Sequence, residues 1–246
     1  MARRRIESCL WISPALDSPQ SGTRRFAHLM RDRCTVVVKA LEVWRLGDGD
    51  AHDLSREVAA VERTAAHHRL ARYHLFGFSA GATVALAAAL ALGEAVLTVT
   101  VLEPASIGDD DWDPVETRWR SQLAQVRALA AHRRPAAFRQ LMMGEGERPP
   151  PTLPDPAVWT ARMDALENML AATGLQSADL AGIAQPTLVL SGGRSHVRFA
   201  KLAERMVQVM PHAESITFAQ CSHLAPPHRE DPLRLRDILI RHWDRP

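Results

Sequence analysis

Residues 72–93 read Arg-Tyr-His-Leu-Phe-Gly-Phe-Ser-Ala-Gly-Ala-Thr-Val-Ala-Leu-Ala-Ala-Ala-Leu-Ala-Leu-Gly. The apolar run 73–78 is typical of a buried strand, whereas the alanine- and leucine-rich run 80–92 favours a helix. Ser79 lies between them, with Gly77 two residues before it and Gly81 two residues after it. A serine on such a sharp turn takes a strained conformation that projects its Oγ, and the flanking glycines remove side chains that would clash with the strand and helix. This stretch therefore predicts a reactive serine at a helix N-terminus.

The composition of the chain limits the classes of protein to which it can belong. Its 246 residues are enough for one sizeable α/β domain, and a net charge of +2 gives no strong attraction to nucleic acid or to an anionic membrane. The longest apolar run, residues 84–92, is too short to span a bilayer, and no long apolar stretch follows Arg3–Arg5, so we expect neither signal peptide nor anchor. We therefore expect no nucleic-acid or membrane partner.

Cysteine and arginine usage point to a cytoplasmic, bacterial protein. The three cysteines, Cys9, Cys34 and Cys221, follow no disulfide or metal pattern, which fits a reduced cytoplasm. Nearly all basic residues are arginine, as is typical of a GC-rich bacterial genome. No metal-ligand spacing and no phosphate-binding glycine loop occurs, so we expect no metal and no cofactor.

Strand-type runs alternate with helical runs along most of the chain. The expected strands are Glu7–Ser13, Cys34–Leu41, Tyr73–Phe78, Leu97–Glu103, Thr187–Gly192 and Glu214–Ala219, and the expected helices between and after them are Arg24–Arg33, Ser55–Leu70, Ala80–Leu92, Val197–Met210 and Pro232–Trp243. This alternation predicts an α/β fold with a mostly parallel sheet of about six strands, covered by helices on both faces. Ligands bind such sheets at the carboxyl ends of the strands.

One segment interrupts the alternation and is expected to form a helical lid. Residues 104–182 contain no convincing strand, whereas Pro114–Met143 and Ala157–Thr173 have helical patterns. We therefore divide the chain into a core of residues 1–103 and 183–246 and an inserted lid of 104–182. Most lid aromatic and methionine side chains are expected to pack against the core. The candidate substrate contacts are Trp112, Met142 and Trp159.

Four motifs resemble those of the α/β-hydrolase superfamily, over nearly the whole chain in element order. They are the Gly-x-Ser-x-Gly turn at 77–81, the Pro-Thr-Leu-Val-Leu strand end that leads to Ser195, the Cys-Ser-His segment at 221–223 and the Leu-Glu-Pro-Ala segment at 102–105. The turn resembles the nucleophile elbow of this family. The resemblance implies a serine hydrolase with a serine, acid and histidine triad in that chain order.

The sequence also departs from the family pattern. The position that usually carries the catalytic acid is Ser195, and neither Arg194 nor His196 can replace an acid. The usual N-terminal hairpin is lacking, so the strand Cys34–Leu41 is expected at a sheet edge, covered by another segment or by a second copy in a homodimer. The family's histidine-glycine oxyanion motif is replaced by residues 13–16, Ser-Pro-Ala-Leu.

The resemblance assigns the base and the oxyanion donors. His223 follows the last strand, where the family places its catalytic histidine, and a histidine titrates near pH 6.5 and can move the serine proton. His228 and His74 are weaker candidates. The oxyanion hole is expected to use the backbone amide of Ala80 and a second amide at Ala15 or Leu16. Pro14 has no amide hydrogen and is excluded.

Glu103 is the preferred candidate for the acid. It ends the strand that follows the elbow, where some family members are known to place their acid, and it keeps the expected chain order. Its alternatives are Asp109, Asp110 and Asp111.

The sequence thus predicts a cofactor-independent serine hydrolase that cleaves a small to medium, largely apolar ester, thioester or lactone. An apolar substrate is expected because the lid carries tryptophan and methionine and no obvious cluster of basic residues aimed at a phosphate. The alternatives are another reaction on this fold, such as C–C bond hydrolysis or cyclisation, or a non-catalytic binding protein.

Overall fold

The sheet is parallel throughout and has six strands. The computed structural model describes residues 6–14, 22–45, 52–107, 113–143, 156–172 and 175–244. The strands are β1 (Cys9–Ile12), β2 (Val36–Lys39), β3 (Tyr73–Phe78), β4 (Val96–Leu102), β5 (Thr187–Gly192) and β6 (Ala213–Phe218). They lie in the order β2-β1-β3-β4-β5-β6, and every neighbouring pair is parallel. Each expected strand is present, with its bounds shifted by two residues at most.

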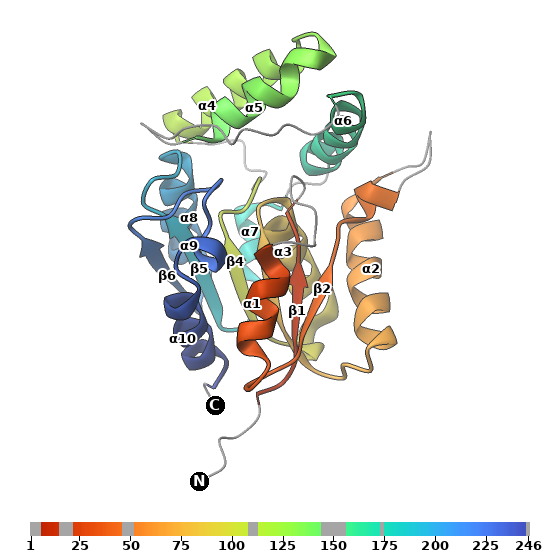
Figure 1. The fold of residues 1–246 in the computed structure, drawn as a ribbon, viewed down its shortest axis with the longest axis vertical. Coiled ribbons are helices and arrows are strands. Elements are labelled where there is room, and N and C mark those ends of the chain that lie inside the picture. The colour runs from red at the N-terminus through yellow and green to blue at the C-terminus, as the bar shows by residue number, and fades with distance from the viewer. Residues whose placement is uncertain are drawn as a thin grey trace.

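Helices cover both faces of this sheet (Figure 1). They are α1 (Gly22–Met30), α2 (Leu54–His67), α3 (Ala80–Leu92), α4 (Pro114–Arg127), α5 (Arg134–Met142), α6 (Pro156–Ala172), α7 (Ser177–Ala181), α8 (Arg198–Val209), α9 (Pro227–Glu230) and α10 (Pro232–Trp243), with short 3-10 turns η1 (Glu42–Arg45), η2 (Gly93–Ala95) and η3 (Ala131–Arg133). Helices α1, α9 and α10 pack together over one face, and α2, α3, α7 and α8 lie over the other. The fold class expected from the sequence is confirmed.

Alternation along the strands creates two cores, one on each face of the sheet. In β1 the side chain of Trp11 enters the core beneath α1 and α10, whereas Leu10 and Ile12 enter the core beneath α2 and α3. Successive strand side chains point to opposite faces, and both faces are covered, so the strands are apolar without a polar side. Helix α3 is buried from Ala80 to Ala89, because its small side chains let it lie close to β3 and β4.

The helices α4, α5 and α6 follow β4 in the chain and lie beyond the end of the sheet (Figure 1). The single helix expected over Pro114–Met143 is divided in two, with η3 between α4 and α5. Pro135 in the first turn of α5 explains the break, because proline lacks an amide hydrogen and clashes with the preceding turn of a continuous helix. Helix α7 packs against α8 rather than against α4–α6. The division of the chain at residues 104 and 182 stays a prediction.

Strand β2 forms one edge of the sheet, as the sequence predicts. It pairs with β1 on one side, through Val36 to Lys39. A second copy of the chain at this edge stays a prediction. Within the described residues, no helix has the length and apolar character needed to cross a membrane.

Candidate active site

Ser79 occupies the strained turn that its sequence context predicts. Its backbone has φ 55° and ψ −122°, a left-handed conformation that is rare for residues with a side chain. A Cβ added to Gly77 would lie 2.6 Å from the Cα of Ala82, and one added to Gly81 would lie 2.5 Å from the Ile12 carbonyl oxygen. Both glycines are therefore required by backbone atoms that cannot move aside, and Ser79 is fixed between β3 and α3.

Glu103 and His223 meet beside this turn, although 120 residues separate them. The Nδ1 atom of His223 lies 2.7 Å from Oε2 of Glu103, and both side chains are almost fully buried. A carboxylate accepts hydrogen bonds, so the neutral imidazole carries its proton on Nδ1 and leaves Nε2 as an acceptor. This tautomer is the one that can remove a proton from a serine hydroxyl.

The second carboxylate oxygen of Glu103 is also occupied. Its Oε1 accepts hydrogen bonds from the Gly192 amide at 2.7 Å and from the Ser195 hydroxyl at 2.5 Å. Ser195 stands where the family usually carries its acid, and its hydroxyl orients the carboxylate that reaches His223. Three donors thus converge on Glu103, whose own backbone has a positive φ of 48°.

Aromatic rings fix the orientation of the His223 imidazole. The Phe199 ring is stacked on it, with centroids 4.7 Å apart and planes 6° apart, and the Phe78 ring lies 5.0 Å away. Phe78 directly precedes Ser79 in the chain, so the imidazole lies next to the elbow. The loop that carries His223 is closed by hydrogen bonds between Ser222 and Ala225.

The two weaker candidates for the base, His228 and His74, are buried histidines. Burial lowers the pKa of His228 to about 3, and among the described residues neither of its ring nitrogens has a hydrogen-bond partner. Burial likewise lowers the pKa of His74 to about 3, and its Nδ1 pairs with Thr98 Oγ1 at 3.0 Å. His74 lies near the start of β3, whereas Ser79 follows the end of that strand. Neither histidine makes the contact with Glu103 that His223 makes.

A cavity of about 300 Å³ opens at Ser79, beneath α4–α6. The described residues that line it are Ser79, Ala80, Ala105, Ser106, Glu116, Trp119, Arg120, Leu123, Arg127, Phe138, Met142, Met163, Leu166, Glu167, Leu170 and Arg198. Met142 lines the cavity, and its contact with a substrate stays a prediction. Trp159 is not among these residues and packs against Phe138, with ring centroids 5.5 Å apart. The candidates Trp112, Ala15, Leu16, Asp109, Asp110 and Asp111 lie outside the described residues.

Three arginine side chains in the cavity wall were not singled out from the sequence. Arg120, Arg127 and Arg198 all line the cavity, together with Glu116 and Glu167. The sequence signal was present in α4, where residues 116, 120, 123 and 127 recur at the spacing of one helix face. Arg198 had no comparable signal, because it belongs to a different helix and meets the cavity only through the fold.

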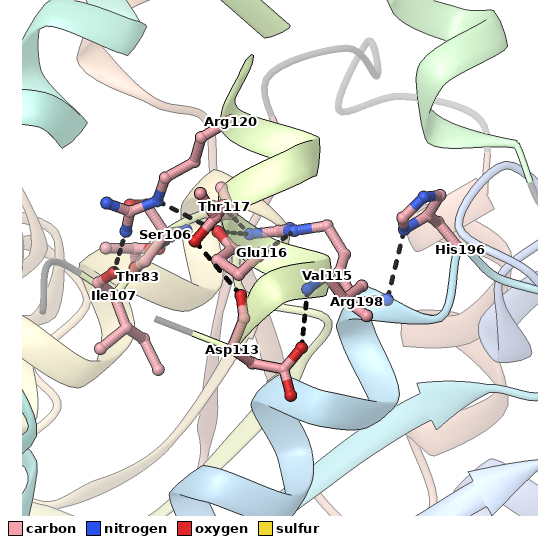
Figure 2. A network of polar contacts seen from close by, with 11 residues as sticks. Thr83, Ser106, Ile107, Asp113, Val115, Glu116, Thr117, Arg120, His196 and Arg198 are labelled. Carbon is pink, nitrogen blue, oxygen red and sulfur yellow. Dashed lines mark hydrogen bonds and ion pairs between the residues drawn. The ribbon is translucent and has the colours of Figure 1, made fainter. Parts of the chain in front are cut away.

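Glu116 of α4 lies between two arginine side chains, Arg120 of its own helix and Arg198 of α8 (Figure 2). Its carboxylate accepts hydrogen bonds from Arg198 Nε at 2.7 Å and Nη2 at 2.9 Å, and from Arg120 Nε at 3.3 Å. Arg198 is fully buried, lies over the Trp119 ring with its guanidinium carbon 3.9 Å from the centroid, and also donates to the Ala105 carbonyl. This buried pair ties α4 to α8 beside the elbow.

Glu167 on α6 is the other carboxylate of the cavity. Burial raises its pKa to about 7, although the nearby guanidinium of Arg127 works in the opposite direction. Arg127 Nε lies 2.7 Å from Glu167 Oε2, and Arg127 Nη2 donates to the Asn168 side chain at 3.0 Å. These contacts tie α4 to α6. Among the residues that the structure describes, no group of three histidine, cysteine or carboxylate side chains is placed to hold a metal ion.

A parallel α/β sheet with a strained serine after its third strand, and a histidine and a glutamate beside that serine, defines the α/β-hydrolase fold. The profile of the Alpha/beta hydrolase family matches residues 11–238. The chain therefore belongs to this family.

Several solved structures share the fold at low sequence identity. A bacterial membrane phospholipase A, described as a virulence factor, is 22% identical with a TM-score of 0.69, covering 97% of this chain and 79% of its own. A hydrolase from Oleispira antarctica is 13% identical with a TM-score of 0.74, covering 98% and 92%. A meta-cleavage product hydrolase from Pseudomonas fluorescens is 13% identical with a TM-score of 0.67, covering 98% and 91%. At these identities the likeness shows the fold alone. No protein with a curated description matches the sequence significantly.

Proposed function

We propose that the protein is a serine hydrolase that cleaves an ester, thioester or lactone through an acyl-enzyme on Ser79. The observation that carries the proposal is the 2.7 Å contact between Glu103 and His223 beside the strained Ser79 turn. A serine, a histidine and a carboxylate in this arrangement activate the hydroxyl as a nucleophile. The contact also supplies a carboxylate for His223, although position 195 carries a serine.

Each residue has a role that follows from its contacts. His223 Nε2 takes the proton of the Ser79 hydroxyl as its Oγ attacks the substrate carbonyl, and returns that proton to the leaving group. Glu103 holds the Nδ1 proton and stabilises the imidazolium. The amide of Ala80 begins α3, where helix amides lack partners within the helix, and it stabilises the oxyanion together with a second amide at Ala15 or Leu16. Water then hydrolyses the acyl-enzyme by the same steps.

The cavity favours a small to medium substrate with an apolar part. A volume of about 300 Å³ is at the lower end of the range of small-molecule sites. Phe138, Met142, Met163 and Leu166 offer apolar surface for an acyl chain or ring. Methionine side chains adapt to irregular shapes, which suits a substrate with a flexible acyl chain.

Covalent labelling separates the proposal from its alternatives. A fluorophosphonate should attach to the wild-type protein at one site, and Ser79→Ala should abolish the labelling because the nucleophile is gone. Ser106→Ala is the matched control, since Ser106 also lines the cavity but lies outside the elbow. Intact mass and peptide mapping give the readout. Labelling that persists in Ser79→Ala, or no labelling of the wild type, contradicts the proposal and favours a binding protein of hydrolase fold.

A further inference from the structure

Helix α4 presents charged side chains to the cavity together with the apolar Trp119 and Leu123. Glu116, Arg120, Leu123 and Arg127 follow one another at intervals of four, three and four residues, and all four line the cavity. A helix that covers a site only to exclude water would direct apolar residues inward and charged residues to solvent. The exposed outer face of α4 carries Arg118, so arginine is present on both sides of the helix.

This row of residues begins beside the nucleophile and leads away from it. Its first residue, Glu116, is bound to Arg198, which donates to the Ala105 carbonyl, and the Ala105 amide donates to the Ser79 carbonyl at 3.2 Å. Arg120 is one turn further along α4 and Arg127 is about 10 Å beyond Arg120, at 1.5 Å per residue. A substrate whose carbonyl lies at Ser79 would therefore extend along this row of guanidinium groups.

Positive charge exceeds negative charge along the described part of the cavity wall. Arg198 and Arg120 share the single carboxylate of Glu116, and Arg127 faces Glu167. Arg198 is buried and bound to Glu116 and Ala105, and its Nη1 atom has no partner among the described residues. Arg120 also donates to the Ile107 carbonyl at 2.6 Å and Arg127 to the Asn168 side chain at 3.0 Å. The side chains of Arg120 and Arg127 are nevertheless 37% and 39% exposed, so a ligand in the cavity can contact them. A wholly apolar substrate would cover these guanidinium groups without replacing their hydration, which is unfavourable.

The part of the cavity wall that α5 and α6 form is mostly apolar. Its apolar side chains are Phe138 and Met142 of α5 and Met163, Leu166 and Leu170 of α6, and its charged side chain is Glu167 of α6. The cavity thus has the nucleophile at its floor, a wall from α4 that is cationic through Arg120 and Arg127, and a mostly apolar wall from α5 and α6. A ligand that matches both walls has an apolar portion and an anionic group at some distance from its reactive carbonyl.

We propose that the substrate is an acyl compound that carries one anionic group, such as a terminal carboxylate, and that Arg120 and Arg127 bind this group. The proposal rests on the proposed function for the bond that is cleaved, but the charge preference of the cavity is a separate property. Arginine binds carboxylates through paired, charge-assisted hydrogen bonds, so the preference acts on both affinity and orientation.

Two aryl esters of matched shape test this preference. The 4-nitrophenyl esters of pentanoic acid and of glutaric acid have the same chain length, and only the second ends in a carboxylate. The wild type should hydrolyse the glutarate ester with a kcat/KM at least about tenfold higher, as expected from a hydrogen bond to a charged group. Arg120→Gln and Arg127→Gln should each reduce this ratio severalfold, whatever their effect on the pentanoate rate. Arg118→Gln, on the exposed side of the same helix, should leave the ratio as in the wild type.

A binding measurement keeps the proposal separate from the proposed function. Calorimetry on Ser79→Ala with the two corresponding 4-nitroanilides measures the charge preference without turnover, and the glutarate compound should bind at least about tenfold more tightly. This preference together with unimpaired turnover in Ser79→Ala would refute the nucleophile and support the cationic wall. Equal or tighter binding of the pentanoate compound, or an effect of Arg118→Gln as large as that of Arg127→Gln, overturns the inference whatever the nucleophile is.

Discussion

The floor of the cavity and its helical cover are held in place by different forces. At the floor, Ser79 is fixed by backbone contacts, because Gly77 and Gly81 lie against carbonyl and Cα atoms of neighbouring elements. In the cover, α4 is tied to α8 by the buried ion pair of Arg198 with Glu116, and it meets α6 where Arg127 lies beside Glu167, whose pKa burial raises to about 7. The floor therefore tolerates almost no change of shape, whereas the cover depends on charge and should respond to pH and to substitution of one partner.

The largest effect is expected at the floor. Gly77→Ala would place a Cβ 2.6 Å from the Ala82 Cα. The backbone of Ala82 cannot move away from this Cβ unless helix α3 moves with it. We expect a loss of at least about 3 kcal/mol in the free energy of unfolding, at or above the usual cost of overpacking a core. Gly182→Ala is the control, because its added Cβ meets the Asp179 carbonyl at 3.1 Å and only a flexible leucine side chain besides. Equal urea midpoints for the two variants would refute the steric account.

An effect of comparable size is expected where the cover meets the core. Arg198→Met leaves the buried carboxylate of Glu116 without its main partner, which should cost about 3–5 kcal/mol. Adding Glu116→Leu should restore part of this loss, since both charges are then removed. Lys201→Met breaks an exposed pair with Glu204 and should cost less than about 1 kcal/mol. Urea denaturation of the wild type and the three variants gives these values, and a double variant less stable than Arg198→Met would contradict the idea of a charge-held cover.

The smallest effect is expected from pH at Glu167. Because its folded-state pKa of about 7 exceeds the ordinary value of 4.5, the folded state favours the protonated form. The stability that this group contributes is present in full below about pH 4.5 and is lost as the pH rises to about 7. The Glu167→Gln variant has no carboxyl group to ionise and so does not lose this stability. As the pH rises over that range, its free energy of unfolding should therefore gain on the order of 1–3 kcal/mol relative to that of the wild type. Arg127, Asp164 and Arg134 are the charged groups that act on it.

Melting temperatures at pH 5, 6, 7 and 8 provide this comparison. Glu204→Gln serves as the control, since its side chain is 58% exposed and should show no such trend. A difference between Glu167→Gln and the wild type that stays constant from pH 5 to pH 8 would show that Glu167 is ionised throughout.

The difference between floor and cover also explains what the sequence could predict. The elbow depends on short-range sterics, so five consecutive residues around Ser79 specify it, and the strands Tyr73–Phe78 and Thr187–Gly192 and the helix Ala80–Leu92 were predicted with their observed bounds. Glu103 could be singled out because a strand end is a local feature and Ser195 is visibly not an acid. The contact between Glu103 and His223 then follows from the parallel order of β4, β5 and β6.

The cover was harder to interpret because its contacts join residues far apart in the chain. Arg198 and Glu116 are 82 residues apart, and nothing in the neighbourhood of either residue indicates the other. The aromatic and methionine content of the segment correctly indicated an apolar wall, but composition cannot show which face of a helix turns inward. Trp159 illustrates this limit, since it packs against Phe138 instead of lining the cavity.

The central claim is that Glu103 is the acid that serves His223, and one kinetic comparison tests it most directly. Glu103→Gln should keep the shape of the site, lose the charge that stabilises the imidazolium, and lower kcat for 4-nitrophenyl esters by about 10²–10⁴-fold. A variant with Asp109, Asp110 and Asp111 all changed to asparagine should stay within a fewfold of the wild type. The reverse result, with Glu103→Gln nearly as active as the wild type and the triple variant inactive, would contradict the account.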